Sequence, residues 1–209
     1  MTISSVRLKE LLAKYGPVGL TWRIMTKPFR IVTEVWRKKL QNYHYIFRYD
    51  PDATSVPVLH GFTIQNFKQI EEIPDSLLEK LNNTFSKTDV QNNLIGVKHR
   101  GCILCVGFLN NEVVSTWLIR RASNIPFWFI DLNPDDVVFI RGVTAPAHRG
   151  KGLASSMHQA MASLFLMDGI NIYIDVSIHN APSLRSVEKS GFILLCKKKA
   201  IYEQWPVEL

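Results

Sequence analysis

Two basic residues alternate with two glycines directly before a segment of strong helical periodicity. The run reads Arg149-Gly150-Lys151-Gly152, and an apolar run at 137–144 that predicts a strand precedes it. The first turn of a helix carries unpaired backbone N–H groups and the positive end of the helix dipole. Glycine lets a backbone come close to a ligand, and the two basic side chains add positive charge. This pattern predicts a cradle for a pyrophosphate.

Two common nucleotide-binding motifs do not fit this run. A P-loop requires Ser or Thr directly after its lysine, whereas Gly152 follows Lys151. A dinucleotide fingerprint requires a third glycine, which residues 153–155 do not supply, and no early strand–helix–strand unit precedes the run. The sequence therefore favours another ligand that carries a pyrophosphate.

Two short motifs lie in order along the second half of the chain. The first is Arg149-x-x-Gly152-x-Ala154. The second begins as Asn180-Ala-Pro-Ser183 and continues as Glu-Lys-Ser-Gly-Phe at 188–192. Together they resemble the signature elements of the GNAT superfamily of acyl-CoA N-acyltransferases, and the order of expected elements from about residue 56 agrees with that family.

The resemblance implies that acetyl-CoA donates the acyl group and that an amine attacks it directly in a ternary complex. It implies that the backbone of Val143 and Thr144 binds the pantetheine arm, and that Asn180 and Ser183 contact the cofactor. A backbone N–H near the end of the 137–144 strand would stabilise the oxyanion. The pyrophosphate would lie on the loop and the first helical turn, at Arg149, Gly150, Lys151, Gly152, Leu153, Ala154 and Ser155.

Two departures from the family pattern concern proton transfer. Val187 stands where members often have a tyrosine that protonates the leaving thiolate, so this acid is missing, moved or unnecessary. Tyr173 and Ser186 are the candidate substitutes. Arg141 occupies a region where many members carry an acidic residue. The resemblance makes Asp175 the candidate general base, because some members that acetylate protein N-termini have a glutamate at the same spacing before the asparagine that corresponds to Asn180. The alternative is that Asp175 is a solvated carboxylate on an edge strand.

The three cysteines do not form a metal or disulfide pattern. Cys102 and Cys105 have C-x-x-C spacing, but they lie in a segment that predicts a strand, where residues three apart face opposite sides. No second Cys or His pair follows at ligand spacing. We expect core thiols, and neither a metal nor a disulfide.

Composition and periodicity predict an α/β fold of the GNAT type, with a mixed central sheet flanked by helices. We expect a basic helical extension at 1–50 and the N-acetyltransferase domain at 51–209. The expected strands are 56–64, 102–109, 112–120, 137–144, 170–176, 192–199 and 200–205, with Asn110-Asn111 as a hairpin turn. The expected helices are 5–15, 29–43, 74–85, one capped by Thr88 or Asp89 that runs to 99, 152–168 and 183–190.

The charge of the chain is concentrated in the extension. Residues 1–50 hold ten Lys and Arg against three acidic residues, a charge of +7, whereas residues 51–209 hold fifteen of each sign. The extension can pack its aromatic residues on the domain, dock on an anionic membrane surface, or contact an acidic partner. We expect no nucleic-acid binding, because such surfaces usually spread over the folded domain.

The sequence thus predicts a cytoplasmic N-acetyltransferase, monomeric or homodimeric, that acts on an amine of a small molecule or peptide. Arg120, Arg121 and Arg141 suggest an anionic acceptor, such as an amino sugar, a nucleotide-sugar amine, an amino acid or a peptide terminus. The alternative is a catalytically weak GNAT-like module that binds acyl-CoA for sensing or scaffolding, which Val187 and Arg141 keep open. Apolar runs are too short for a membrane span.

Overall fold

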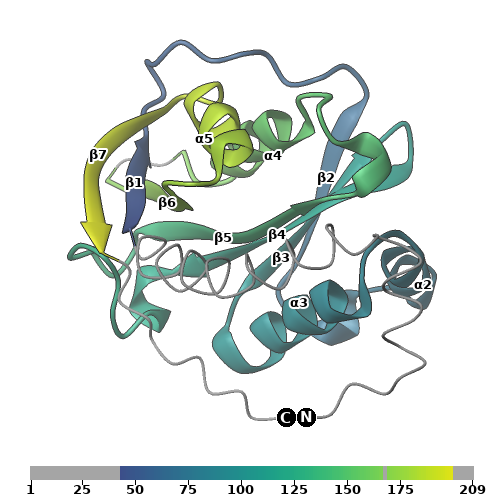
Figure 1. Cartoon of the computed structure of the whole chain (residues 1–209). Helices are drawn as coiled ribbons and strands as arrows, with labels where there is room; N and C mark the ends of the chain where they lie inside the picture. The colour runs from purple at the N-terminus through teal and green to yellow at the C-terminus, as the bar shows by residue number, and fades with distance from the viewer. Residues whose placement is uncertain (1–42, 167–168, 200–209) are drawn as a thin grey trace, which may run out of the picture. The chain divides into compact units, whose positions relative to one another are not determined.

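A seven-stranded mixed sheet organises the part of the chain that the computed structural model describes, residues 43–166 and 169–199. The strand order is β2-β3-β4-β5-β6-β1-β7 (Figure 1). Neighbouring strands are antiparallel except β5 and β6, which are parallel. The strands are β1 Tyr43–Tyr49, β2 Phe62–Phe67, β3 Ile103–Leu109, β4 Glu112–Arg121, β5 Val137–Thr144, β6 Ile172–Ser177 and β7 Phe192–Lys199.

Helices cover both faces of the sheet, as Figure 1 shows. Helices α2 (Asp75–Thr84) and α3 (Lys87–Arg100) pack on one face, over a core that includes Leu104 and Leu118. Helices α4 (Leu153–Ala162) and α5 (Ala181–Glu188) pack on the other, over a core that includes Phe139 and Ile174. Short 3-10 helices lie at Ile70–Glu72, Ala122–Asn124 and Pro146–His148. The mixed sheet with helices on both faces confirms the expected α/β fold.

Strand β1 corrects the expected domain boundary. Residues 43–49 were expected in the extension, with a helix that reached Tyr43, but they form a strand between β6 and β7. The segment Tyr-His-Tyr-Ile-Phe-Arg-Tyr is rich in aromatic and β-branched residues, which suit a pleated surface. The described domain therefore begins at Tyr43 instead of residue 51. The other expectations for 1–42, including helices and membrane contact, lie outside the described residues, as does the expected strand at 200–205.

Most elements of the domain lie where the periodicity predicts them. The hairpin of β3 and β4 is confirmed, because Asn110 and Asn111 both have positive φ, at 50° and 69°, as a two-residue turn requires. The strand expected at 56–64 is wrong in its bounds, because β2 begins only at Phe62. Helix α4 ends at Ala162 instead of reaching residue 168.

The cap of α3 is also corrected. Neither Thr88 nor Asp89 caps this helix. Instead, the Ser86 hydroxyl oxygen accepts a hydrogen bond from the Asp89 N–H, and the Ser86 hydroxyl donates to the Asp89 carboxylate. Serine and aspartate both favour the N-cap position, and Ser86, which precedes Asp89 in the chain, occupies it.

Cys102 and Cys105 lie in the cores on opposite faces of the sheet, as the strand periodicity predicts. Burial raises the pKa of the Cys105 thiol to about 12, so this thiol stays protonated at neutral pH. Within the described residues, no group of three or more His, Cys, Asp or Glu side chains could hold a metal ion. Among the same residues, no helix combines the length and apolar character that crossing a membrane requires.

Candidate active site

Strands β5 and β6 pair at one end and separate at the other. They are in register only from Val137↔Ile172 to Phe139↔Ile174. The buried carboxylate of Asp136 holds the closed end, because its Oδ1 accepts from the backbone and side-chain N–H groups of Asn171 at 3.0 and 3.1 Å. Beyond Phe139 the ladder stops, and a cavity of about 480 Å3 lies there.

The cavity passes through the sheet from one face to the other. Phe139, Ile174 and Val187 line it and belong to the core beneath α4 and α5. Ile140 also lines it and packs against the core on the α2–α3 face. Because alternate residues of a strand face opposite sides, the opening between β5 and β6 gives access from both faces.

A β-bulge shapes the β5 wall of the cavity. Between Thr116↔Val143 and Leu118↔Ile140, two residues of β5, Arg141 and Gly142, lie opposite Trp117 alone. Arg141 has φ +53°, which is uncommon for a side chain other than glycine. A Cβ on Gly142 would lie 1.9 Å from Cζ2 of Trp117, so the indole occupies the space of a side chain there. The bulge turns the backbone of β5 away from the regular ladder next to the cavity.

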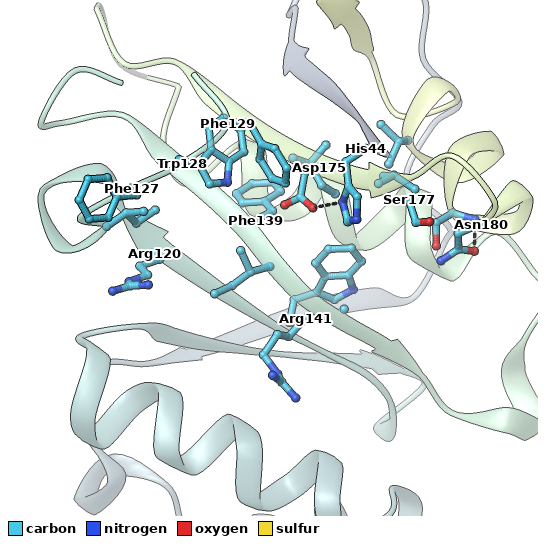
Figure 2. Close-up of a pocket in the computed structure, with 18 residues that line it drawn as sticks. His44, Arg120, Phe127, Trp128, Phe129, Phe139, Arg141, Asp175, Ser177 and Asn180 are labelled. Atoms are coloured by element: carbon cyan, nitrogen blue, oxygen red, sulfur yellow. Dashed lines mark hydrogen bonds and ion pairs between the residues drawn. The ribbon is translucent and has the colours of Figure 1, made fainter. Parts of the chain in front are cut away.

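A histidine–aspartate pair lines the α2–α3 side of the cavity. His44 Nδ1 lies 2.6 Å from Asp175 Oδ2, and the two side chains are 23% and 21% exposed (Figure 2). His44 comes from β1 and Asp175 from β6, which are adjacent antiparallel strands. A proton on Nδ1 donated to the carboxylate would leave Nε2 as a basic nitrogen. The pair therefore has the chemistry of an oriented general base.

The segment between β4 and β5 forms the aromatic side of the cavity. Phe127, Trp128 and Phe129 all line it (Figure 2). The Phe129 ring stacks on His44 with centroids 5.4 Å apart, and Trp128 meets Tyr173 edge to face at 5.6 Å. These contacts fix the segment over β1 and β6, and the Phe129 ring packs on the imidazole.

The predicted pyrophosphate loop is a turn that leads into an uncapped helix. Gly152 is the N-cap of α4, with φ +80° and no side-chain cap. Gly150 also has positive φ, and a Cβ on either glycine would meet no described atom within 4 Å. Arg149 Nε donates to the Thr144 carbonyl oxygen at 3.2 Å, which ties the loop to the end of β5. The loop therefore leaves space for a ligand beside both glycines.

Helix α5 connects this loop to the cavity. The Ser155 hydroxyl, in the first turn of α4, donates to the Ser186 carbonyl oxygen at 3.0 Å. Asn180 caps α5, since its Oδ1 accepts from the Ser183 N–H at 3.3 Å, and both residues line the cavity. The start of α4 therefore lies beside the last turn of α5, and the start of α5 lies at the cavity.

The structure gathers some predicted site residues and separates others. The cavity is lined by three of the predicted residues, Asp175, Asn180 and Ser183. It is also lined by Val187, which stands where the family often has a tyrosine and is fully buried. Residues 149–155 and 143–144 do not line it and lie beside it. Leu153 is 1% exposed, so only its backbone can reach a ligand.

Neither candidate acid lines the cavity. Tyr173 lies at the closed end of the β5–β6 pair, opposite Val138. Burial raises the pKa of Tyr173, Asp136 raises it further, and Arg48 lowers it. The Ser186 hydroxyl donates to the Ser183 carbonyl oxygen at 2.9 Å within α5.

Sequence reasoning missed His44 and the aromatic segment. His44 was assigned to the extension, although the aromatic and β-branched run at 43–49 before Asp50-Pro51 is a usable strand signal. The run Phe-Trp-Phe at 127–129 carries no positional signal of its own, because only the fold brings it over β6.

His158 joins the helix of the loop to the wall of the cavity. It is fully buried on α4, and its ring meets Trp117 edge to face with centroids 4.5 Å apart. Burial lowers the pKa of His158 to about 3, so the ring is neutral. Its Nδ1 lies 2.9 Å from the Ser190 hydroxyl, whose proton is donated to carbonyl oxygens of α5. Nδ1 therefore carries the proton, and Nε2 has no partner among the described residues.

The sequence model of the acetyltransferase (GNAT) family matches residues 67–192, which include the helices of both faces, the β5–β6 opening and the loop. The chain belongs to this family. The GNAT match begins after β1, so His44 lies outside it. No curated protein sequence matches the chain.

Solved structures of GNAT proteins share the fold. An acetyltransferase of the GNAT family from Colwellia psychrerythraea is 9% identical with a TM-score of 0.53, over 75% of this chain. The chain spans about half, 53%, of that protein's length. Aminoglycoside acetyltransferase AAC(6')-Ib in complex with coenzyme A is 22% identical with a TM-score of 0.48, over 63% of this chain and 84% of that one.

Proposed function

We propose that this chain transfers an acetyl group from acetyl-CoA to a primary amine by direct attack in a ternary complex. The main observation that supports this proposal is one cavity that crosses the sheet between β5 and β6. The His44–Asp175 pair lines it on one face, and Asn180 and Ser183 line it at the start of α5, whose last turn contacts the start of α4. A donor and an acceptor can therefore meet in the opening from opposite faces.

Acetyl-CoA would supply an acyl group activated as a thioester. The N–H groups from Gly150 to Ser155 would bind its pyrophosphate, helped by the charges of Arg149 and Lys151. The edge of β5 from Ile140 to Thr144, which β6 no longer pairs, would bind the pantetheine arm through its backbone. An N–H of the bulge would stabilise the negative charge that develops on the carbonyl oxygen.

The His44–Asp175 pair would remove the proton that blocks the attack. An amine is mostly an ammonium ion at neutral pH, and it must lose a proton before its lone pair can form the C–N bond. His44 Nε2 would take this proton, and the Asp175 carboxylate would orient the ring and stabilise the resulting imidazolium. As the C–S bond breaks, the nitrogen loses its second proton to water, and the CoA thiolate leaves and takes a proton from water.

A side-chain acid is not required for this step, because a CoA thiolate is a tolerable leaving group. Val187 at the usual tyrosine position fits a site without such an acid. The role of Tyr173 as a substitute acid stays a prediction, and its place at the closed end of β5–β6 favours a supporting role.

The test measures thiol release from acetyl-CoA with a panel of primary amines, with the acetylated product identified by mass spectrometry. Gly152→Asp should abolish acetyl-CoA binding, because a carboxylate there repels the pyrophosphate and its Cβ blocks approach. Gly169→Asp is the matched control, since Gly169 also has positive φ and open space, but lies beyond the far end of α4.

Two outcomes of this test would contradict the proposed function. Acetyl-CoA affinity that survives Gly152→Asp would overturn the assigned cofactor site. Tight binding of acetyl-CoA without turnover of any amine would favour the alternative function, an acyl-CoA-binding module, which Val187 keeps open.

A further inference from the structure

We propose that the acceptor is an amine with an aromatic body and an acidic group, and that Arg120 binds the acidic group. This inference rests on the proposed function, because it assumes that the amine reaches His44. It concerns the α2–α3 side of the cavity, where Arg120, the aromatic segment and the His44–Asp175 pair are found.

The charge of the cavity favours an anion. Its titratable side chains, within the described residues, are His44, Asp175, Arg120 and Arg141. The only carboxylate, Asp175, is already paired with His44. Arg120 therefore adds a positive charge to a cavity whose one carboxylate is already engaged, which favours an acidic group.

Arg120 presents a donor that lacks a partner. Its Nη2 donates to the Asn124 carbonyl oxygen, which fixes the direction of the side chain. Its Nε–H is buried and has no hydrogen-bond partner among the described residues. Buried donors in folded proteins are rarely left unpaired. Because Arg120 lines the cavity, a small shift of its side chain would let this donor form a charge-assisted bond with a carboxylate or phosphate oxygen of the acceptor.

The sheet register sets the distance between Arg120 and the base. Arg120 lies opposite Val138 on β5, and Val138 lies opposite Tyr173 on β6, on the same face as Asp175. Arg120 and Asp175 are thus two strands apart and two residues apart along the sheet, a backbone separation of about 12 Å. An acceptor that spans this distance carries its amine and its acidic group at opposite ends of a body the size of a ring.

The aromatic segment runs over that interval. Figure 2 shows Phe127 on the Arg120 side, Phe129 on the Asp175 side and Trp128 between them. Phe127 is 74% exposed and lines the cavity, so its ring is available to a ligand. Flat apolar side chains favour a flat apolar body through stacking and burial.

The experiment compares 4-(aminomethyl)benzoate with benzylamine, which differ only in the carboxylate. The full-length protein should prefer the benzoate in kcat/KM by roughly 10- to 100-fold, the range expected for a charged hydrogen bond. Arg120→Gln should abolish the preference, and an unchanged melting temperature shows that the variant is folded. Arg121→Gln, at the exposed neighbouring position on the opposite face of β4, should keep the preference.

Calorimetry with the same two amines and the CoA-saturated protein separates the two proposals. Tighter binding of the benzoate that depends on Arg120 supports the acceptor class even if no amine is acetylated. Equal rates and equal affinities for the two amines, or a preference that survives Arg120→Gln, would overturn it while acetylation itself stands. A phosphonate in place of the carboxylate then shows which acidic group Arg120 binds better.

Discussion

The loop at 149–155 and the His44–Asp175 side of the cavity are built in different ways. The loop is one continuous stretch, and the atoms that we propose to bind the pyrophosphate belong to the backbone at the start of α4. The opposite side collects side chains from β1, β4, β6 and the segment between β4 and β5. A site made of backbone depends on glycines and helix geometry, whereas a site made of side chains depends on which strands the fold brings together.

The largest expected effect is on the His44–Asp175 side of the cavity, which is built of side chains. His44→Gln should lower kcat/KM by about 10²- to 10⁴-fold at neutral pH, the usual worth of a general base. The loss should shrink at alkaline pH, where the amine is already deprotonated. Affinity for acetyl-CoA should not change, because the substitution does not alter the loop at 149–155. The measurement is a pH–rate profile of the variant beside wild type.

Asp175→Asn sharpens the assignment within the pair. If Asp175 acts through His44, its loss should be smaller than that of His44→Gln and should follow the same pH trend. Full activity in His44→Gln together with an inactive Asp175→Asn would make the carboxylate itself the base.

Two glycine-to-alanine changes test the contrast directly. Gly142→Ala should destabilise the fold by about 1–3 kcal/mol, because its Cβ overlaps the Trp117 ring. Gly150→Ala meets open space and bears only the cost of its positive φ, about 1–2 kcal/mol. Gly150→Ala should weaken acetyl-CoA binding more than Gly142→Ala. Urea unfolding and CoA titration measure both effects, and the reverse order in CoA affinity would contradict the backbone assignment.

His158 lies between the helix of the loop and the wall of the cavity. It should make the fold sensitive to acid. Its pKa falls from about 6.5 in the unfolded chain to about 3 in the fold, so only the unfolded state binds a proton between these values. Stability from this group is complete above pH 6.5 and is lost as pH falls, by about 1.4 kcal/mol per pH unit. Unfolding curves from pH 7 to 4 measure the slope, and His158→Gln should reduce it.

The smallest expected effect is at the side chains of the loop. Lys151→Gln should weaken acetyl-CoA binding only about 2- to 5-fold, because exposed charges near a helix start contribute little. The difference should fade at high salt through screening. A loss as large as that of Gly152→Asp would show that side-chain charge, and not the backbone, binds the pyrophosphate.

The contrast also explains how much the sequence could reveal. The strand, loop and helix at 137–162 are contiguous, so their residues carry a local pattern that predicts both structure and ligand class. Asp175 was found through its spacing to Asn180. His44 was not, because its place beside Asp175 is set by sheet pairing across 131 residues of sequence. Arg120 was noticed only as a charge, and its unpaired Nε–H and its distance from the base required coordinates.

The position of β1 has a consequence for the order in which the protein folds during synthesis. It is the first described strand to leave the ribosome, yet its two partners, β6 and β7, are the last. Both of its edges remain unpaired until almost the whole chain has been made, which is a source of slow folding and of aggregation. The same delay applies to His44 and Asp175, so the pair can form only on a nearly complete sheet.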